Sequence, residues 1–196
     1  WQSLVDQLSH GVRVVGADAT SIGGDGDHCE VVTTDDRTLT ARSVVLTVGG
    51  PDAAARLLGR APFDVGPPAY ASCLDLGIRR PTAPRGLMGI DQPLYLNTHC
   101  PPARLAPPGH QVVHVMRYGN GNGASPSAQR DELLAHARVA GIEADHIVEQ
   151  LYLHRMVACT AISTARLGGL RGRPGTADSG VPGVFLAGDW VGSHGH

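Results

Sequence analysis

The sequence lacks the features that would point to nucleic acid or to a membrane. Its Lys and Arg residues together number 16 against 18 Asp and Glu residues, a formal net charge of -2. No basic stripe is present that could neutralise the phosphates of a duplex, and no apolar run approaches the roughly 20 residues that a membrane-spanning helix needs. We therefore expect no nucleic-acid partner and a cytoplasmic location, with peripheral association with a membrane left open.

The four cysteines lack the spacing of a metal-binding or redox pair. No two of them form a Cys-x-x-Cys motif, which argues against a zinc knuckle and against a catalytic dithiol. We expect four reduced and mostly buried thiols, at Cys29, Cys73, Cys100 and Cys159.

The ten histidines do not form a metal-binding pattern either. His110 and His114 fall on or beside an expected strand, and no carboxylate stands in a ligand pattern with them or with His194 and His196. A seryl hydrolase is excluded because no Gly-x-Ser-x-Gly elbow is present. We expect Arg79, Arg117 and Arg155 at solvated sheet edges rather than at a substrate. The sequence thus predicts no metal, and its catalytic residues stay unknown.

The most informative segment is residues 183–193, which read Gly-Val-Phe-Leu-Ala-Gly-Asp-Trp-Val-Gly-Ser. The apolar run from Val184 to Ala187 stops at Gly188 and Asp189, a pattern typical of a buried strand that presents a glycine turn and one carboxylate to a ligand. Gly188 would let the backbone approach a bulky anionic ligand. Asp189 would accept hydrogen bonds from hydroxyls, and the following amides would face phosphate. The alternative is an ordinary turn in which Asp189 caps a helix.

The first 59 residues have the pattern of short strands that lead into one helix. Residues 23–26 and 35–36 are expected turns, and the run 43–48 is apolar enough for burial on both faces. Pro51 suits the first turn of a helix and Gly59 its C-terminal cap. The expected strands are 12–15, 30–34, 38–40 and 43–48, and the expected helix is 52–58.

From Arg60 onward, prolines punctuate short β-like runs, which favours a mixed or antiparallel sheet. The expected strands are 71–79, 94–97 and 111–118, with a glycine-rich turn at 119–123. Ser125 and Pro126 then have the pattern of an N-cap and a first helical residue, and Gly141 ends that helix. Residues 145–158 are ambiguous, with a strand from Ile147 favoured.

The segment 183–193 resembles the C-terminal flavin-binding motif of FAD-dependent oxidoreductases of the phytoene desaturase and amine oxidase superfamily. The order of elements is similar to the second half of that family's fold, in which the chain leaves the FAD domain, builds a substrate domain and returns. The resemblance implies an α/β plus β-rich fold, namely the C-terminal half of a Rossmann-like FAD-binding domain with an inserted mixed-sheet substrate domain. The implied boundaries are 1–59 and 171–196 for the FAD domain and 60–170 for the substrate domain.

The resemblance implies FAD as the cofactor and assigns residues to it. Asp189 would bind a ribityl hydroxyl, and Trp190 and Val191 would lie near the flavin. Ala19 matches a position whose backbone meets the adenine, and Gly49 and Gly50 match a tight turn near the cofactor, although simple turn and sheet geometry explains those three equally well. The implied cofactor-binding residues are Ala187, Gly188, Asp189, Trp190, Val191, Gly192, Ala19, Gly49 and Gly50.

The activity that the resemblance implies is transfer of hydride from an organic, apolar small-molecule substrate to flavin, as in phytoene desaturases. An amine oxidase-type flavoenzyme and a non-catalytic β-rich binding module stay as alternatives. The family's N-terminal Gly-x-Gly-x-x-Gly loop is missing, and the chain begins at Trp1. We therefore expect a C-terminal piece of a longer flavoenzyme, inactive by itself.

Overall fold

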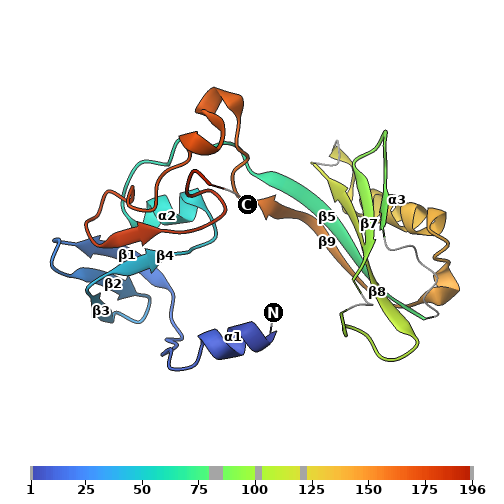
Figure 1. The fold of residues 1–196 in the computed structure, drawn as a ribbon, viewed down its shortest axis with the longest axis horizontal. Coiled ribbons are helices and arrows are strands. Elements are labelled where there is room, and N and C mark those ends of the chain that lie inside the picture. Colours follow the sequence, from blue (N-terminus) through green and yellow to red (C-terminus); the bar gives the residue numbers. More distant parts are fainter. Residues whose placement is uncertain (1, 80–85, 100–102, 120–122, 195–196) are drawn as a thin grey trace. The chain divides into compact units, whose positions relative to one another are not determined.

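The computed structural model describes residues 2–79, 86–99, 103–119 and 123–194. The chain divides into two compact units, one formed by Trp1–Val65 with Ser163–His196 and the other by Gly66–Ile162 (Figure 1). We call them unit 1 and unit 2. Cys100, His196 and most of the expected turn at 119–123 lie outside the described residues.

Unit 1 is built from short elements around two small sheets. An antiparallel sheet has the order β1-β2-β3, and a parallel pair joins β10 to β4. The elements are α1 (Gln2–Leu8), β1 (Ala19–Gly24), β2 (Cys29–Thr33), β3 (Thr38–Ala41), β4 (Val44–Leu46), α2 (Pro51–Leu57), the 3-10 helices η3 (Ala165–Leu167) and η4 (Gly169–Gly172), and β10 (Val184–Leu186).

Cys29 connects the two sheets of unit 1. Its buried thiol donates to the carbonyl of Pro182 at 3.6 Å, just before β10 begins. A Cβ at Gly183 would lie 2.7 Å from Cys29 Sγ, and Gly183 has φ +79. Glycine is required there by both the left-handed backbone and the close sulfur atom. The loop that precedes β10 is therefore held against β2.

Unit 2 is one antiparallel sheet with a helix on one face. The strand order is β6-β7-β8-β5-β9, and every neighbouring pair is antiparallel. The elements are β5 (Ala69–Arg79), β6 (Gly86–Met88), β7 (Leu94–Thr98), β8 (His110–Tyr118), α3 (Pro126–Val139), the 3-10 helix η2 (Ala144–His146) and β9 (Ile147–Cys159).

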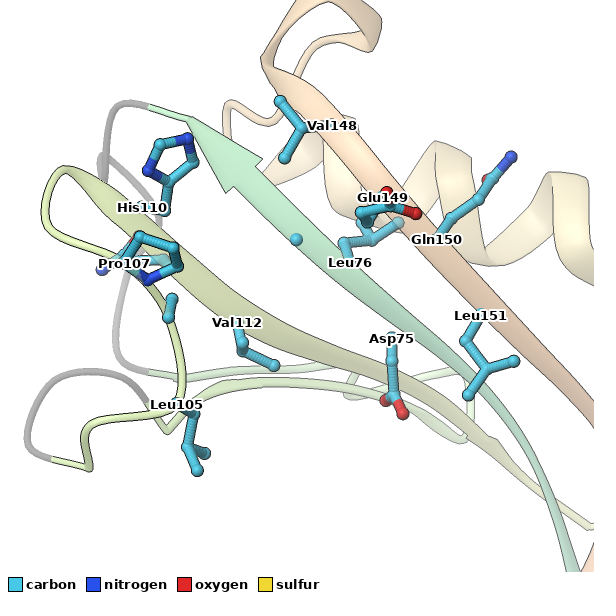
Figure 2. Close-up of a pocket in the computed structure, with 13 residues that line it drawn as sticks. Asp75, Leu76, Leu105, Pro107, His110, Val112, Val148, Glu149, Gln150 and Leu151 are labelled. Carbon is cyan, nitrogen blue, oxygen red and sulfur yellow. The ribbon is translucent and has the colours of Figure 1, made fainter.

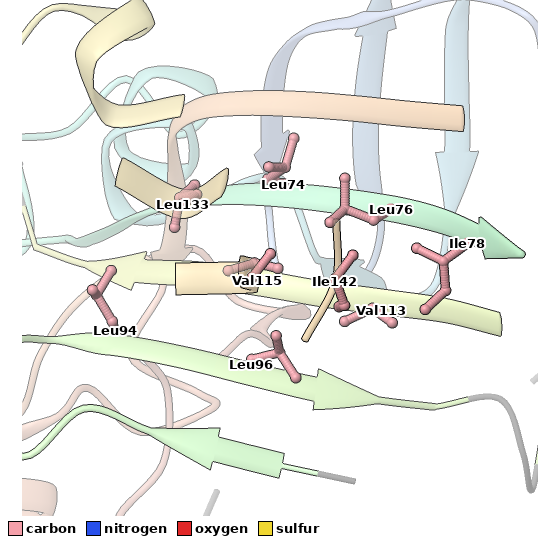
Figure 3. Packing of buried hydrophobic residues seen from close by; sticks show 10 residues of the cluster. Leu74, Leu76, Ile78, Leu94, Leu96, Val113, Val115, Leu133 and Ile142 are labelled. Carbon is pink, nitrogen blue, oxygen red and sulfur yellow. The ribbon is translucent and has the colours of Figure 1, made fainter. Parts of the chain in front are cut away.

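The core of unit 2 lies between the sheet and α3. Because successive side chains of a strand point to opposite faces, Leu74, Leu76 and Ile78 of β5 share the face that α3 covers with Leu133 (Figure 3). The other buried members of this core are Leu94, Leu96, Val113, Val115, Ala137 and Ile142. Cys73, Asp75 and Gly77 consequently belong to the opposite, open face of β5.

Polar contacts fix α3 to the sheet as well. Ser72 donates to Gln129 Oε1 at 2.6 Å, and its hydroxyl accepts the amide of Arg155 on β9 at 3.1 Å. Arg117 of β8 pairs with Glu132 at 3.1 Å. The expected solvated edge position is therefore wrong for Arg117, because β8 is an interior strand and its side chain meets α3.

Local signals predicted most elements correctly. Pro51 is the first residue of α2 and Gly59 has φ +59 just after it. Ser125 caps α3 by accepting the amide of Ala128 at 3.2 Å. The ambiguous region 145–158 is a strand from Ile147, as favoured. Of the two sheet types expected for unit 2, the antiparallel one is found.

Three expectations about local structure are wrong. Residues 12–15 form no strand, and Val12 and Val14 are 60% and 85% exposed, because β-branched residues form a strand only where another strand pairs with them. Gly23 and Gly24 belong to β1, and the turn follows at 25–28. Val45 of β4 is 63% exposed, so this strand is buried on one face in this chain.

No helix in the described part of the chain has the length and apolar character that crossing a bilayer requires.

Candidate functional site

The parallel pair β4 and β10 brings two of the expected site segments to one sheet edge. Val184 pairs with Val44 and Leu186 with Leu46, so both strands end at the same edge. The amide of Ala187 donates to the carbonyl of Leu46 at 3.0 Å and extends the pairing. The turns 47–50 and 187–192 therefore lie beside each other at the carboxyl end of parallel strands, which is where α/β sheets bind ligands.

The turn after β10 is held by its own backbone and by a buried indole. The amide of Val191 donates to Gly188, and that of Gly192 to Pro174 at 2.9 Å. Trp190 is 2% exposed, and its ring centroid lies 4.9 Å from that of Phe63. A Cβ on Gly188 would lie 2.8 Å from Trp190 Nε1. Gly188 is thus needed by the chain's own packing, whatever a ligand requires.

Asp189 is exposed in the structure, as is Gly188. A carboxylate on an exposed turn at this edge can accept hydrogen bonds from hydroxyl groups. The arrangement has the donor and acceptor chemistry that a ribityl chain would need.

The turn after β4 leads into a hollow of unit 1. Gly49 has φ +39 with open space where a Cβ would be, and buried Gly50 precedes α2 and accepts the amide of Ala54 at 3.1 Å. A pocket of about 430 Å³ lies between the start of β1 and α2. It is lined by Asp18, Ala19, Thr20, Val48, Ala53, Arg56 and Leu57. Ala19 and the neighbourhood of Gly49 therefore border one cavity.

Unit 2 has a larger pocket over the open face of its sheet, about 510 Å³ in volume (Figure 2). Leu105, Val112, Val148 and Leu151 give it mainly apolar walls. Its ionisable side chains are Asp75, Glu149 and His110. No Arg or Lys lines it among the described residues. A mainly apolar hollow with a few polar groups is the usual form of a small-molecule site.

A polar cluster stands on the same open face. His114 Nδ1 lies 2.5 Å from Asp75 Oδ1, and Cys73 donates to the same oxygen at 3.1 Å. The rings of His99 and His114 meet edge to face, with centroids 4.6 Å apart. Burial, and secondly the hydrogen bond to Asp75, raise the pKa of the Cys73 thiol to about 12.

Sequence reasoning missed this cluster. It found no carboxylate in a ligand pattern with His114, because Asp75 is 39 residues away and meets it only through the register of β5 and β8. Strand alternation alone puts Cys73 and Asp75 on one face of β5. The missing information was which residue of β8 pairs with Asp75.

Comparison with known proteins supports the fold. The FAD-NAD(P)-binding family model matches residues 1–51. A protein named as a protoporphyrinogen oxidase from Exiguobacterium sp. 255-15 has a TM-score of 0.61 at 16% identity, over 98% of this chain and 47% of its own. A redesigned putrescine oxidase has a TM-score of 0.67 at 14% identity, over 95% and 46%. Reduced UDP-galactopyranose mutase has a TM-score of 0.66 at 12% identity, over 89% and 41%.

No curated protein sequence matches the chain significantly. The chain spans a little under half the length of the solved structures it resembles.

The chain is a mixed α/β protein with two antiparallel sheets and one parallel strand pair, and its fold is similar to part of these solved structures. The resemblance expected from the sequence is thereby confirmed. FAD is the cofactor that these comparisons support, and the exposed turn at Asp189 with the open backbone at Gly49 fits such a group.

Proposed function

We propose that the protein containing this chain is an FAD-dependent oxidoreductase that transfers hydride from an organic substrate to flavin. The observation that carries the proposal is the parallel β4 and β10 edge, with Gly188 and Asp189 after one strand and Gly49 and Gly50 after the other. Bound FAD would supply the hydride acceptor. Asp189 would hold a ribityl hydroxyl, and Ala19 would border the adenine. The two glycine turns would let the protein backbone come close to the cofactor.

In this proposal the two units divide the work. Unit 1 corresponds to the C-terminal half of a Rossmann-like FAD-binding domain, expected at 1–59 and 171–196, and unit 2 to the inserted substrate domain, expected at 60–170. The support is that unit 2 has its own core and a pocket on its open face. In flavin chemistry the protein supplies orientation and a dry environment for the substrate, which apolar walls such as Leu105, Val112 and Leu151 would provide.

The apolar walls are compatible with the phytoene desaturase-like substrate that the sequence suggested. A neutral hydrocarbon, however, makes no use of carboxylates. Asp75 and Glu149 both line the pocket, and no lysine or arginine among the described lining residues opposes them. The Asp75 carboxylate already pairs with His114, so Glu149 is the carboxylate that faces a cationic ligand. Because a charge beside apolar walls attracts an opposite charge more strongly than in water, Glu149 favours the amine oxidase-type alternative, with a cationic amine on an apolar body.

The experiment that tests the function is product analysis with the intact, flavin-loaded protein. Carotenoid precursors and apolar amines are offered separately, and desaturated products and aldehydes with hydrogen peroxide are measured. Glu149→Gln should raise KM for an amine while leaving KM for a neutral substrate unchanged. Asp145→Asn, whose side chain is 85% exposed and outside the pocket, is the control. A protein that binds no flavin and oxidises neither class would instead be a non-catalytic binding module.

A further inference from the structure

Three different metal-binding side chains converge on the open face of unit 2. Cys73 and Asp75 are two residues apart on β5, and His114 faces Asp75 across the pairing of β5 with β8. One atom of each, a thiol sulfur, a carboxylate oxygen and a ring nitrogen, lies within 4.8 Å of the other two. The sequence predicted no metal, but only because this convergence depends on strand register.

The hydrogen bonds of the cluster show a place that a cation could occupy. Asp75 Oδ1 lies 3.1 Å from Cys73 Sγ and 2.5 Å from His114 Nδ1. Usual zinc bond lengths of about 2.0 to 2.3 Å in a tetrahedral arrangement imply ligand atoms about 3.3 to 3.6 Å apart. Small side-chain rotations would therefore convert the hydrogen-bonded cluster into a set of metal ligands. The metal ion would replace the hydrogen atoms that now lie between Asp75 Oδ1 and its two partners.

The donor chemistry selects the kind of metal. One sulfur, one imidazole nitrogen and one carboxylate oxygen suit zinc and its neighbours, whereas magnesium and calcium prefer six or more oxygen ligands. A thiolate and a carboxylate would together balance the two charges of the ion. The three side chains differ in exposure: Cys73 is 5% exposed, while the side chains of His114 and Asp75 are 27% and 30% exposed. The sulfur ligand is therefore buried in the protein, and the other two ligands are accessible from solvent.

The accessible side of the cluster borders the pocket of unit 2. Asp75 also lines the 510 Å³ pocket, and the His99 ring, 4.6 Å from that of His114, stands beside the cluster. Three protein ligands with a fourth position free is the arrangement of zinc sites that bind water or substrate. We propose that Cys73, Asp75 and His114 form a site for a zinc-like divalent transition metal, with one coordination position directed to water or to a ligand in the pocket.

The proposal is tested by zinc binding to the intact protein, purified without a polyhistidine tag. Equilibrium dialysis followed by elemental analysis should give one zinc per chain above any zinc bound by other parts of the protein. Cys73→Ser and His114→Gln should each abolish that equivalent or weaken it by more than the roughly 10- to 100-fold typical for loss of an outer-shell partner. Cys159→Ser, at a half-buried cysteine of the same unit, should change nothing.

X-ray absorption of the zinc-loaded wild type needs no variant. It therefore tests sulfur ligation of the metal even where a variant fails to fold. The expected spectrum has one sulfur at about 2.3 Å with nitrogen or oxygen at about 2.0 Å. A coordination shell without sulfur, no extra equivalent of zinc, or full retention of zinc by folded Cys73→Ser would each overturn the proposal. None of these readouts depends on flavin or on turnover, so the result is independent of the proposed oxidoreductase activity.

Discussion

Replacement of Gly188 by alanine separates two reasons for a glycine in the turn after β10. The sequence suggested that the absent side chain lets a cofactor approach. The structure adds a contact within the chain, because the new Cβ would lie 2.8 Å from Nε1 and 3.0 Å from Cδ1 of Trp190. The 2.8 Å separation is shorter than real Cβ contacts and the 3.0 Å one is at their limit, so the indole or the turn has to move.

The movement is opposed because Trp190 is 2% exposed and packed against Phe63. Forcing extra volume into such a site typically costs about 1 to 3 kcal/mol, and we expect Gly188→Ala to lower the free energy of unfolding by this amount. Urea unfolding of the flavin-free protein measures it. Gly192→Ala, in the same turn at φ +87 but with nothing within 4 Å of the new Cβ, is the matched control: it adds backbone strain without a clash and should lower the free energy of unfolding by less than Gly188→Ala does.

A double-mutant cycle identifies the cause. In a Trp190→Ala background Nε1 and Cδ1 of the indole are both absent, so Gly188→Ala should cost less there than in the wild type, and the difference is the coupling energy. Equal costs in the two backgrounds would refute the contact with Trp190. A variant of unchanged stability that nevertheless loses flavin would show that the glycine serves the cofactor alone.

Three further predictions follow from single contacts. Asp189→Ala should weaken FAD binding by about 1 to 3 kcal/mol; equal visible absorbance per protein would count against the assignment. Ser125→Ala should destabilise the protein by about 1 kcal/mol through loss of the α3 cap, with Ser125→Asp restoring most of it in urea unfolding. Arg37 and Thr33 lower the pKa of Asp35 from 3.8 to about 2. The stabilisation by Asp35 is therefore present above about pH 4 and lost as the pH falls toward 2, so the stability difference between wild type and Asp35→Asn should shrink over that interval; a constant difference would contradict it.

Features encoded by adjacent residues could be predicted from the sequence. The start of α3 needs only Ser125 and Pro126, and the end of β10 needs only the change from Leu186 to Gly188. In these places the signal is steric or a local hydrogen bond, so it does not depend on the rest of the fold. The two glycine turns, at 47–50 and 187–192, were each visible in this way.

Features that depend on pairing between distant strands could not be predicted. Residues 12–15 have strand composition but no strand forms, because composition says nothing about a partner. The cluster of Cys73, Asp75 and His114 exists only in one register of β5 against β8, and a slip by one residue would move His114 to the face of α3. Trp190 was assigned to the flavin's surroundings, and its contact with Phe63 could not be read from a separation of 127 residues along the chain.

The most direct test of the proposed flavin site is amide hydrogen exchange of the intact protein with and without FAD. The account predicts that FAD slows exchange at residues 47–50 and 187–192, the two turns at the edge of β4 and β10, and leaves the α3 helix unaffected. Protection confined to other segments, or a protein that takes up no FAD at all, would contradict the central claim.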